Sequence, residues 1–540
     1  MIHLPRTVVI VGAGFSGAVV AINLLRLSYW RPARIVLVER AERMARGAAY
    51  AEKAYPYLLN VPAGRMSLNS SDPLEFLKFA QQRVPNATAE DFLPRSLYGE
   101  YLETALRDAE LASPAHVQLV KIRGDVCSIE HVGSKRSVRV ELKDGSSFIA
   151  DDVVLALGNP PPGHVPGTER LAGSPRYVSD PWSTPRQSTS ANTRSRSTRA
   201  LGPAPLAGVP ADRMFEPGET VLVIGTGLSM ADTVLAGTHT TTAPRDGMHA
   251  SPTDVIFHAI SRRGLVPPSQ TAFRHAGCDD DGTKLVRAAS LSARRLLRAV
   301  RELTEEVQGR GGDWREAITC VRNVAPVIWQ RLPHSERQRF LRHARPYWDV
   351  HRHRLPQETL SKLHDLRRAD KLHVHAGRIL GFELVGEKIR VSWRARGSDD
   401  IQTLLVDRVV NCTGADYNPV RSRDPLLRSL LAQGLATPDP LGLGLRTANF
   451  GALLDSRNRI VPNLYYIGPM LRADHWECTA AQELRVHAER LAHHLAAPAV
   501  APALGASRSA SKDAVRSLAH SHKREQALAV ARRIPSVRPV

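Results

Sequence analysis

The sequence predicts an α/β protein with two separate parallel-sheet units, each followed by a β-meander, and a helical insertion within the second unit. Three observations predict this fold. Two short apolar runs, 7–11 and 220–224, each lead through closely spaced glycines into a helical pattern. Two segments of equal length, 117–158 and 373–414, alternate polar and apolar residues and end in an apolar strand. Apolar residues at helical spacing mark the insertion, 283–368.

The first unit contains a Gly-x-Gly-x-x-Gly motif between its first strand and a helix expected to end at Leu27. Such glycines allow a tight turn, close approach of the backbone to a pyrophosphate, and close packing of helix on strand, while the helix N-terminus offers free N–H donors. A second strand, 34–38, leads to an acid at the position that binds a ribose hydroxyl in units of this kind. The predicted nucleotide-binding residues are Gly12, Gly14, Ser16, Gly17, Glu39 and Arg40.

The second unit repeats this pattern with two changes. Met230 replaces the third glycine, so we expect its helix to pack less closely. Two arginines replace the acid after the second strand, 254–260, and guanidinium groups pair with a 2′-phosphate, which favours NADPH over NADH. The alternative is a pair of solvated arginines at a strand end. The predicted binding residues here are Gly225, Gly227, Ser229, Arg262 and Arg263.

Six stretches carry a resemblance to a known family: VVIVGAGFSG, YLLNVPAGRMS, GTGLSMAD, AISRRG, YWDVHRHR and YYIGPM. Together they span about residues 5–495. The chain resembles the bacterial FAD/NAD(P)-binding flavoproteins related to the flavin-containing and N-hydroxylating monooxygenases. The resemblance implies two Rossmann-type dinucleotide-binding domains with β-meander connections and a helical insertion. It also implies that Asn60, Met66, Gly468 and Thr479 lie near FAD.

The resemblance and the composition together predict the domain organisation. We expect the FAD-binding domain in two parts, 1–182 and 405–497, and the NAD(P)H-binding domain at 218–404. Segments rich in Ser, Pro, Ala and basic residues predict a disordered insertion at 183–217 and a basic, largely disordered tail at 498–540, with one short helix near 522–533. The apolar residues of the helical insertion are Leu285, Leu291, Leu296, Val300, Leu303 and Val307.

Charge and cysteine content limit the classes of function. The 540 residues include 73 Lys and Arg against 53 Asp and Glu, a net charge of +20, which favours anionic ligands. No nucleic-acid-binding module accompanies this charge, so nucleic acid is not an expected partner. Five scattered cysteines, with no Cys-x-x-Cys, argue against a disulfide framework, a metal site or a dithiol enzyme. We expect a soluble, cytoplasmic protein, because no long apolar run and no signal peptide is recognised.

A basic cluster beside Trp348 is the candidate substrate site. Two cations and two titratable rings converge there, which suits a planar or carboxylated anion. We hypothesise that Arg352 and Arg354 hold an anionic substrate and that His351 or His353 handles its proton. The alternative is an exposed basic turn before Pro356.

These features predict an FAD-dependent, NADPH-consuming monooxygenase that hydroxylates a small polar nitrogenous or anionic substrate, a urate-like purine or an amino acid, through a flavin hydroperoxide. Its expected partners are this small molecule and molecular oxygen. Two alternatives remain open: an NAD(P)H oxidoreductase or oxidase without oxygen insertion, and a non-catalytic regulator that binds FAD or NADP(H).

Overall fold

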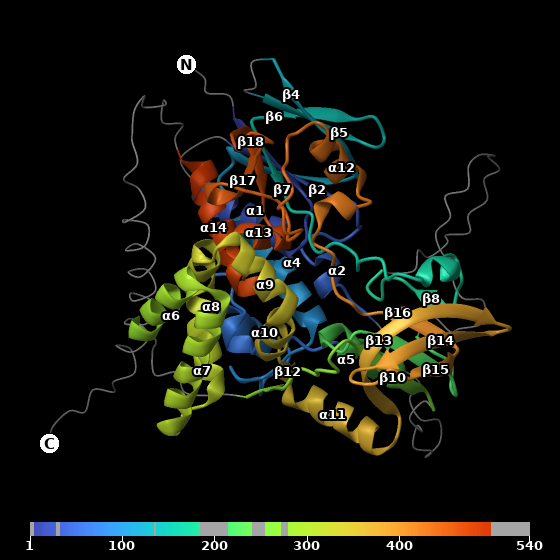
Figure 1. Ribbon diagram of the computed structural model, residues 1–540. Coiled ribbons are helices and arrows are strands. Elements are labelled where there is room, and N and C mark those ends of the chain that lie inside the picture. Colours follow the sequence, from blue (N-terminus) through green and yellow to red (C-terminus); the bar gives the residue numbers. More distant parts are fainter. Residues whose placement is uncertain are drawn as a thin grey trace, which may run out of the picture. The chain divides into compact units, whose positions relative to one another are not determined.

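Strand β1 and the glycine turn after it open the first of two large sheets in this computed structural model (Figure 1). The sheet order is β17-β18-β7-β1-β2-β3, and only the pairing of β17 with β18 is antiparallel. The strands are β1 (Arg6–Val11), β2 (Ala33–Glu39), β3 (Val117–Arg123), β7 (Asp152–Leu155), β17 (Ala452–Leu454) and β18 (Ile460–Tyr466). The strands predicted at 7–11 and 34–38 are confirmed, and two distant parts of the sequence complete one sheet.

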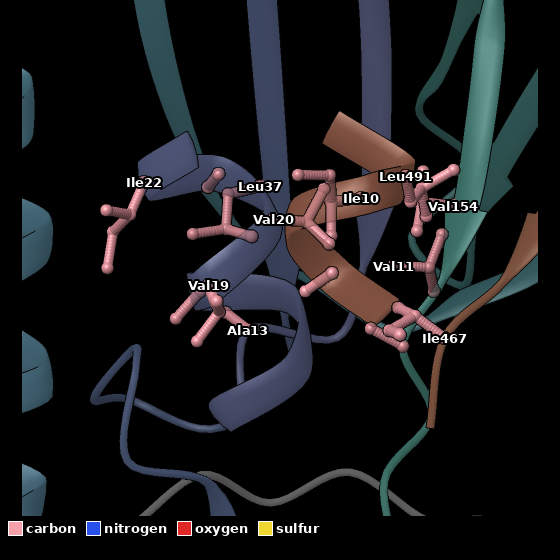
Figure 2. Packing of buried hydrophobic residues seen from close by; sticks show 14 of the residues in the cluster. Ile10, Val11, Ala13, Val19, Val20, Ile22, Leu37, Val154, Ile467 and Leu491 are labelled. Atoms are coloured by element: carbon pink, nitrogen blue, oxygen red, sulfur yellow. The ribbon is translucent and has the colours of Figure 1, made fainter. Parts of the chain in front are cut away.

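Helices from both ends of the chain cover this sheet. Figure 2 shows α1 (Phe15–Leu27) and α14 (Ala481–Ala496) side by side, with Val20 and Leu491 among the side chains that pack on Ile10 and Val154 of the sheet. All four of these side chains are buried, and burial of each stabilises the fold by roughly 1.5–3 kcal/mol. The other helices of this part are α2 (Gly47–Tyr50), α3 (Glu75–Gln81), α4 (Arg95–Leu111), α12 (Pro425–Ala432) and α13 (Arg472–His475).

The second large sheet has the order β15-β14-β13-β10-β9-β16-β8. Its strands are β8 (Tyr177–Val178), β9 (Thr220–Ile224), β10 (Ile256–Ser261), β13 (Leu372–Val385), β14 (Lys388–Ala395), β15 (Ile401–Val406) and β16 (Arg408–Asn411). The first part of β13 runs parallel to β10, and its second part pairs antiparallel with β14. One long strand therefore belongs to both the nucleotide unit and its meander. Helices α5 (Leu228–Thr238) and α11 (Gln357–Arg368) pack on the parallel part.

The two predicted meanders differ in their attachment. In the first, β4 (Val126–Val132), β5 (Ser137–Leu142) and β6 (Ser147–Ala150) form a separate three-stranded antiparallel sheet. In the second, the meander continues the large sheet through β13. Both meanders end in a strand whose four residues are all buried, β7 and β16, as the sequence predicts.

The helical insertion comprises α6 (Asp279–Leu291), α7 (Ala293–Gly309), α8 (Trp314–Arg331), α9 (His334–His343) and α10 (Arg345–Arg352). A short two-stranded sheet pairs the segment before these helices, β11 (Ser269–Gln270), with the segment after them, β12 (Leu355–Pro356). Two expectations need correction. Leu291, assigned to the apolar face, is 64% exposed because it ends α6. Cys320 on α8 is disulfide-bonded, so the argument against disulfides fails at this position.

The structure describes residues 5–28, 33–53, 55–133, 137–183, 214–239, 254–271 and 279–497. Most of the predicted insertion at 183–217 and all of the tail at 498–540, with its predicted helix, lie outside these residues. None of the described helices combines the length and apolarity that crossing a bilayer requires. The described His, Cys, Asp and Glu residues form no group of three suited to a metal ion.

Candidate nucleotide-binding sites

The first glycine turn leaves no room for side chains at two of its three glycines. Gly12 has a φ of +98°, and a Cβ there would overlap the carbonyl oxygen of Ala156. A Cβ on Gly17 would overlap the carbonyl oxygen of Gly12, so α1 starts directly against the turn. These two glycines are therefore required by the fold itself.

Gly14 differs, because a Cβ there would meet only Gly47, at 3.5 Å from its Cα. Gly14 is the N-cap of α1, no side chain caps this end, and the first turn carries no acid. The buried Ser16 lies in this same first turn. The backbone N–H donors at the start of α1 are therefore open to a negatively charged group, which fits the pyrophosphate of a dinucleotide.

Glu39 joins the end of β2 to this turn. Its carboxylate accepts hydrogen bonds from the backbone N–H groups of Ala13 at 2.8 Å and Ala41 at 3.0 Å. The carboxylate thus lies beside the glycine turn, where a ribose hydroxyl is expected. Arg40 is exposed, and its Nη2 lies 3.3 Å from Asp424 at the start of α12.

The residues expected near the flavin come from three segments. Asn60 is half-buried in the loop before the 3₁₀ turn η2 (Ala63–Arg65), whereas Met66 is buried in the core of the first domain. Gly468 precedes the 3₁₀ turn η6 (Pro469–Leu471) and has a φ of +145°. A Cβ on Gly468 would lie 2.7 Å from the Tyr466 phenol oxygen. Thr479 is half-buried, two positions before α14.

The second glycine turn has the same form but leaves more open space. We call the space at each glycine turn and helix start, which a phosphate group would occupy, a cradle. Gly225 has a φ of +118°, and a Cβ there would overlap the Cys412 carbonyl oxygen. Gly227 is the N-cap of α5, and a Cβ there would meet no atom within 4 Å. Ser229 is half-buried in the first turn of α5. The start of α5 therefore has space and free N–H donors for a phosphate group.

The turn after β10 is tied to this cradle. The Thr226 hydroxyl donates to the Leu265 carbonyl oxygen at 2.6 Å and lies 2.9 Å from the Ser261 hydroxyl oxygen. Of the two arginines in this turn, Arg262 is exposed. Arg263 turns toward the helical insertion, where its guanidinium lies 5.3 Å from the ring centroid of Tyr347.

A buried ion pair connects the two nucleotide units. Arg95 at the start of α4 donates to Asp232 on α5 at 2.9 Å, and it also donates to the Leu58 carbonyl oxygen at 3.0 Å. Burial raises the pKa of Asp232, and the positive charge of Arg95 opposes this shift. Asp232 ends the GTGLSMAD motif, so the same segment contributes the cradle and the contact between the units.

The basic cluster after Trp348 is arranged differently from the hypothesis. Arg352 is not open to a ligand, because its Nε donates to Glu477 at 2.8 Å and its Nη2 lies 3.4 Å from Glu483. The indole N–H of Trp348 donates to the other oxygen of Glu477 at 2.8 Å. Burial alone would raise the pKa of Glu477, but Arg352 and its neighbours lower it to about 2.

The other three residues of the cluster have different environments. Burial lowers the pKa of His353 to about 4, so this ring is neutral at pH 7. His351 is exposed, and its Nδ1 lies 2.7 Å from the Tyr347 carbonyl oxygen. Burial and then the charge of Arg315 lower the pKa of Arg354 to about 10, and its guanidinium lies 5.8 Å from the ring centroid of Trp314. Arg354 thus keeps its positive charge at pH 7.

Sequence reasoning missed the acidic partners of this cluster. Glu477 and Glu483 follow Arg352 by more than a hundred positions, and no local spacing pattern links them. Arg322 on α8 joins the same network through Glu483 and Gln482. The sequence offered only one general hint of these partners. An arginine that becomes buried requires a carboxylate, and that carboxylate can come from elsewhere in the chain.

Comparisons with known proteins agree with this geometry. Residues 9–160 match the family model described as FAD-NAD(P)-binding. No curated protein sequence matches the chain.

Solved structures share the fold over nearly the full chain. Ornithine hydroxylase from Pseudomonas aeruginosa superposes with a TM-score of 0.57 at 15% identity, covering 91% of this chain and 99% of that chain. L-lysine 6-monooxygenase from Pseudomonas syringae gives 0.56 at 16%, covering 90% and 98%. The FAD-bound cadaverine monooxygenase from Erwinia amylovora gives 0.54 at 11%, covering 94% and 100%. This chain therefore shares the fold of these solved structures, and its residues 9–160 match a family model described as FAD-NAD(P)-binding.

Proposed function

We propose that this protein is an FAD-dependent, NADPH-consuming monooxygenase that hydroxylates a small nitrogenous substrate. The observation that carries the proposal is the pair of uncapped helix starts at Gly14 and Gly227, each open to a phosphate group within one fold. Glu39 follows the first cradle and Arg262 the second, which suits FAD in the first and NADPH in the second.

The residues of the chain bind and orient the two cofactors. FAD and NADPH, when bound, supply hydride transfer and the reaction of reduced flavin with oxygen. The starts of α1 and α5 bind the two pyrophosphates through backbone N–H groups. Glu39 binds the ribose of FAD, and Arg262 binds the 2′-phosphate of NADPH. The ion pair of Arg95 with Asp232 keeps the two cradles in a fixed relation.

The solved structures of similar fold support a choice of substrate class. The relatives named above act on ornithine, lysine and cadaverine, which all carry a primary amine. We take the amine nitrogen of a small amino acid or diamine as the first substrate class and a urate-like purine as the second. Arg354 is the cluster residue proposed to contact an anionic substrate, and the exposed His351 is the one proposed to handle a proton.

The experiment measures NADPH oxidation in air by the purified full chain loaded with FAD. The panel contains amino acids, diamines and purines, with hydrogen peroxide and hydroxylated product measured in parallel. We expect one class to stimulate NADPH oxidation and to give product, and we expect Arg354→Gln to lose this stimulation while FAD content stays unchanged. A matched control is Arg368→Gln, which neutralises another arginine of the predicted insertion, one that pairs with the exposed Asp365.

The alternatives predict other results. NADPH oxidation that yields only peroxide, with no stimulation by any compound, would identify an oxidase or reductase. Binding of FAD and NADP⁺ with negligible turnover would identify a regulator. A protein that takes up no FAD would overturn the proposal.

A further inference from the structure

The turn after β14 lies beside the arginines that follow β10. Ser261, the last residue of β10, pairs with Ala376 of β13, and the next residue of β13, Gly377, pairs with Ala395 at the end of β14. Arg396 follows directly, and its backbone N–H donates to the Ala376 carbonyl oxygen at 2.9 Å. Arg262 and Arg396 are therefore each the first residue after a strand that pairs with β13 around Ala376.

Gly264, which follows Arg262 and Arg263 in the turn after β10, also packs on Ala376. Gly264 has a φ of +63°, and a Cβ there would lie 3.1 Å from the Cβ of Ala376. This close approach brings the turn after β10 against the segment that anchors Arg396. The two turns thus form one continuous surface at the carboxyl end of β10, which is the end where a Rossmann-type unit binds the adenosine ribose.

Tyr347, from α10 of the insertion, connects the side chains on this surface. Its exposed phenol group lies near the guanidinium groups of Arg263 and Arg396, and these, with Arg263 first, lower the pKa of Tyr347. Arg263 also reaches the His343 carbonyl oxygen at 3.5 Å. Within the described part of the chain, no carboxylate pairs with Arg262, Arg263 or Arg396. By contrast Arg394, on the same strand as Ala395, pairs with Asp399.

We propose that Arg396 is a specificity-determining residue that binds the 2′-phosphate of NADPH together with Arg262, and that Tyr347 is a positioning residue that holds Arg396 and Arg263 in place. The inference rests on the proposed function, because it assigns further residues to the NADPH site. A 2′-phosphate is a dianion with three acceptor oxygens, so it suits guanidinium groups that lie on adjoining turns without an acidic partner. The meander and the insertion then both contribute to dinucleotide selection.

The test measures binding of two small nucleotides to the FAD-loaded protein by calorimetry, with no turnover required. The probes are 2′,5′-ADP, which carries the 2′-phosphate, and 5′-AMP, which lacks it. We expect the wild type to prefer 2′,5′-ADP, and we expect Arg396→Gln to weaken 2′,5′-ADP binding about tenfold or more with 5′-AMP binding unchanged. Arg396→Lys retains a positive charge and should recover part of this loss.

Two further variants separate the roles. Arg394→Gln removes an exposed arginine two positions before Arg396 and should leave the binding of both nucleotides unchanged. Tyr347→Phe keeps the ring but removes the phenol oxygen near both guanidinium groups, so it should weaken 2′,5′-ADP binding less than Arg396→Gln does. Equal binding of 2′,5′-ADP by wild type and Arg396→Gln, or an equal loss for both probes, would overturn the inference. A wild type without preference for 2′,5′-ADP would instead overturn the NADPH assignment of the proposed function.

Discussion

Single glycines separate two physical roles at the nucleotide cradles. Gly12, Gly17 and Gly225 stand where a Cβ would overlap a backbone carbonyl, so they are needed for the turn to form at all. Gly14 and Gly227 stand where a side chain would fit, and their lack of one leaves space for a ligand. The same residue type thus serves folding at one position and binding two positions later.

We predict that Gly227→Ala folds normally but binds NADP⁺ at least about tenfold more weakly, because its Cβ enters the phosphate space while meeting no protein atom. The stability cost of alanine at this N-cap is small, about 1 kcal/mol or less. The measurement is a melting temperature together with NADP⁺ titration. Gly225→Ala is the control, and it should lower the melting temperature clearly. Normal NADP⁺ binding by Gly227→Ala would contradict the assigned cradle.

Buried histidines make stability depend on pH. Burial lowers the pKa of His353 to about 4 and of His487 to about 3, whereas both titrate near 6.5 when unfolded. The unfolded chain therefore binds more protons below pH 6.5, so this contribution to stability is complete above pH 6.5 and is lost as the pH falls toward 4.

We predict a falling melting temperature between pH 7 and pH 5, and a weaker fall in His487→Leu, with each buried histidine contributing about 1–2 kcal/mol at pH 5. Thermal melting at several pH values checks this. Identical profiles for wild type and His487→Leu would refute the prediction.

At the scale of elements, the pair of Arg352 with Glu477 is one of several ion pairs that join the helical insertion to the segment around α13 and α14. Arg352 ends α10, and Glu477 lies between α13 and α14. The pair is buried, so each charge depends on the other. Trp476, next to Glu477, has a φ of +54° and stacks on Trp329 of α8 at 4.6 Å between ring centroids. Packing on the insertion therefore accompanies an unusual backbone at this junction.

We predict that Glu477→Gln destabilises the protein by up to about 3–5 kcal/mol, because it removes the 2.8 Å partner of the Arg352 charge and leaves only Glu483, at 3.4 Å, to compensate that charge. Replacing both residues, Arg352→Met with Glu477→Leu, should recover most of this loss, since the pair itself contributes little net stability. Chemical or thermal unfolding of the three proteins checks both statements. If the double variant is no more stable than the Glu477→Gln variant, the ion pair contributes more to stability than the mutual compensation of two buried charges.

At the scale of the whole molecule, the contact between α4 and α5 relates the two nucleotide cradles. Hydride transfer needs the two cofactor rings to meet, so the relative position of the units matters more for rate than for binding. The pair of Arg95 with Asp232 is buried, and Arg95 also holds the loop that carries Leu58 and Asn60. The contact thus connects the NADPH helix to the loop expected beside the flavin.

We predict that Asp232→Asn retains FAD and NADP⁺ binding but slows flavin reduction by NADPH about tenfold or more, because the two units lose their charged contact. Anaerobic stopped-flow reduction measures this rate. Glu100→Gln is the matched control. Glu100 lies on α4, and the substitution removes its charge from an exposed pair with Arg83. Equal rates in both variants would show that the contact is only structural.

The sequence by itself determined the two parallel-sheet units, both glycine turns, Glu39 and the buried end strands β7 and β16. These depend on contacts between residues near in sequence, where strand, turn and helix each leave a local pattern. The tertiary structure alone decided the surroundings of Arg352, Arg396 and Met66. Arg352 meets Glu477, Arg396 meets Tyr347, and Met66 enters the core through pairings between distant segments. A side chain's partners across the fold, and not its own type, determine whether its charge or its apolar surface remains open to a ligand.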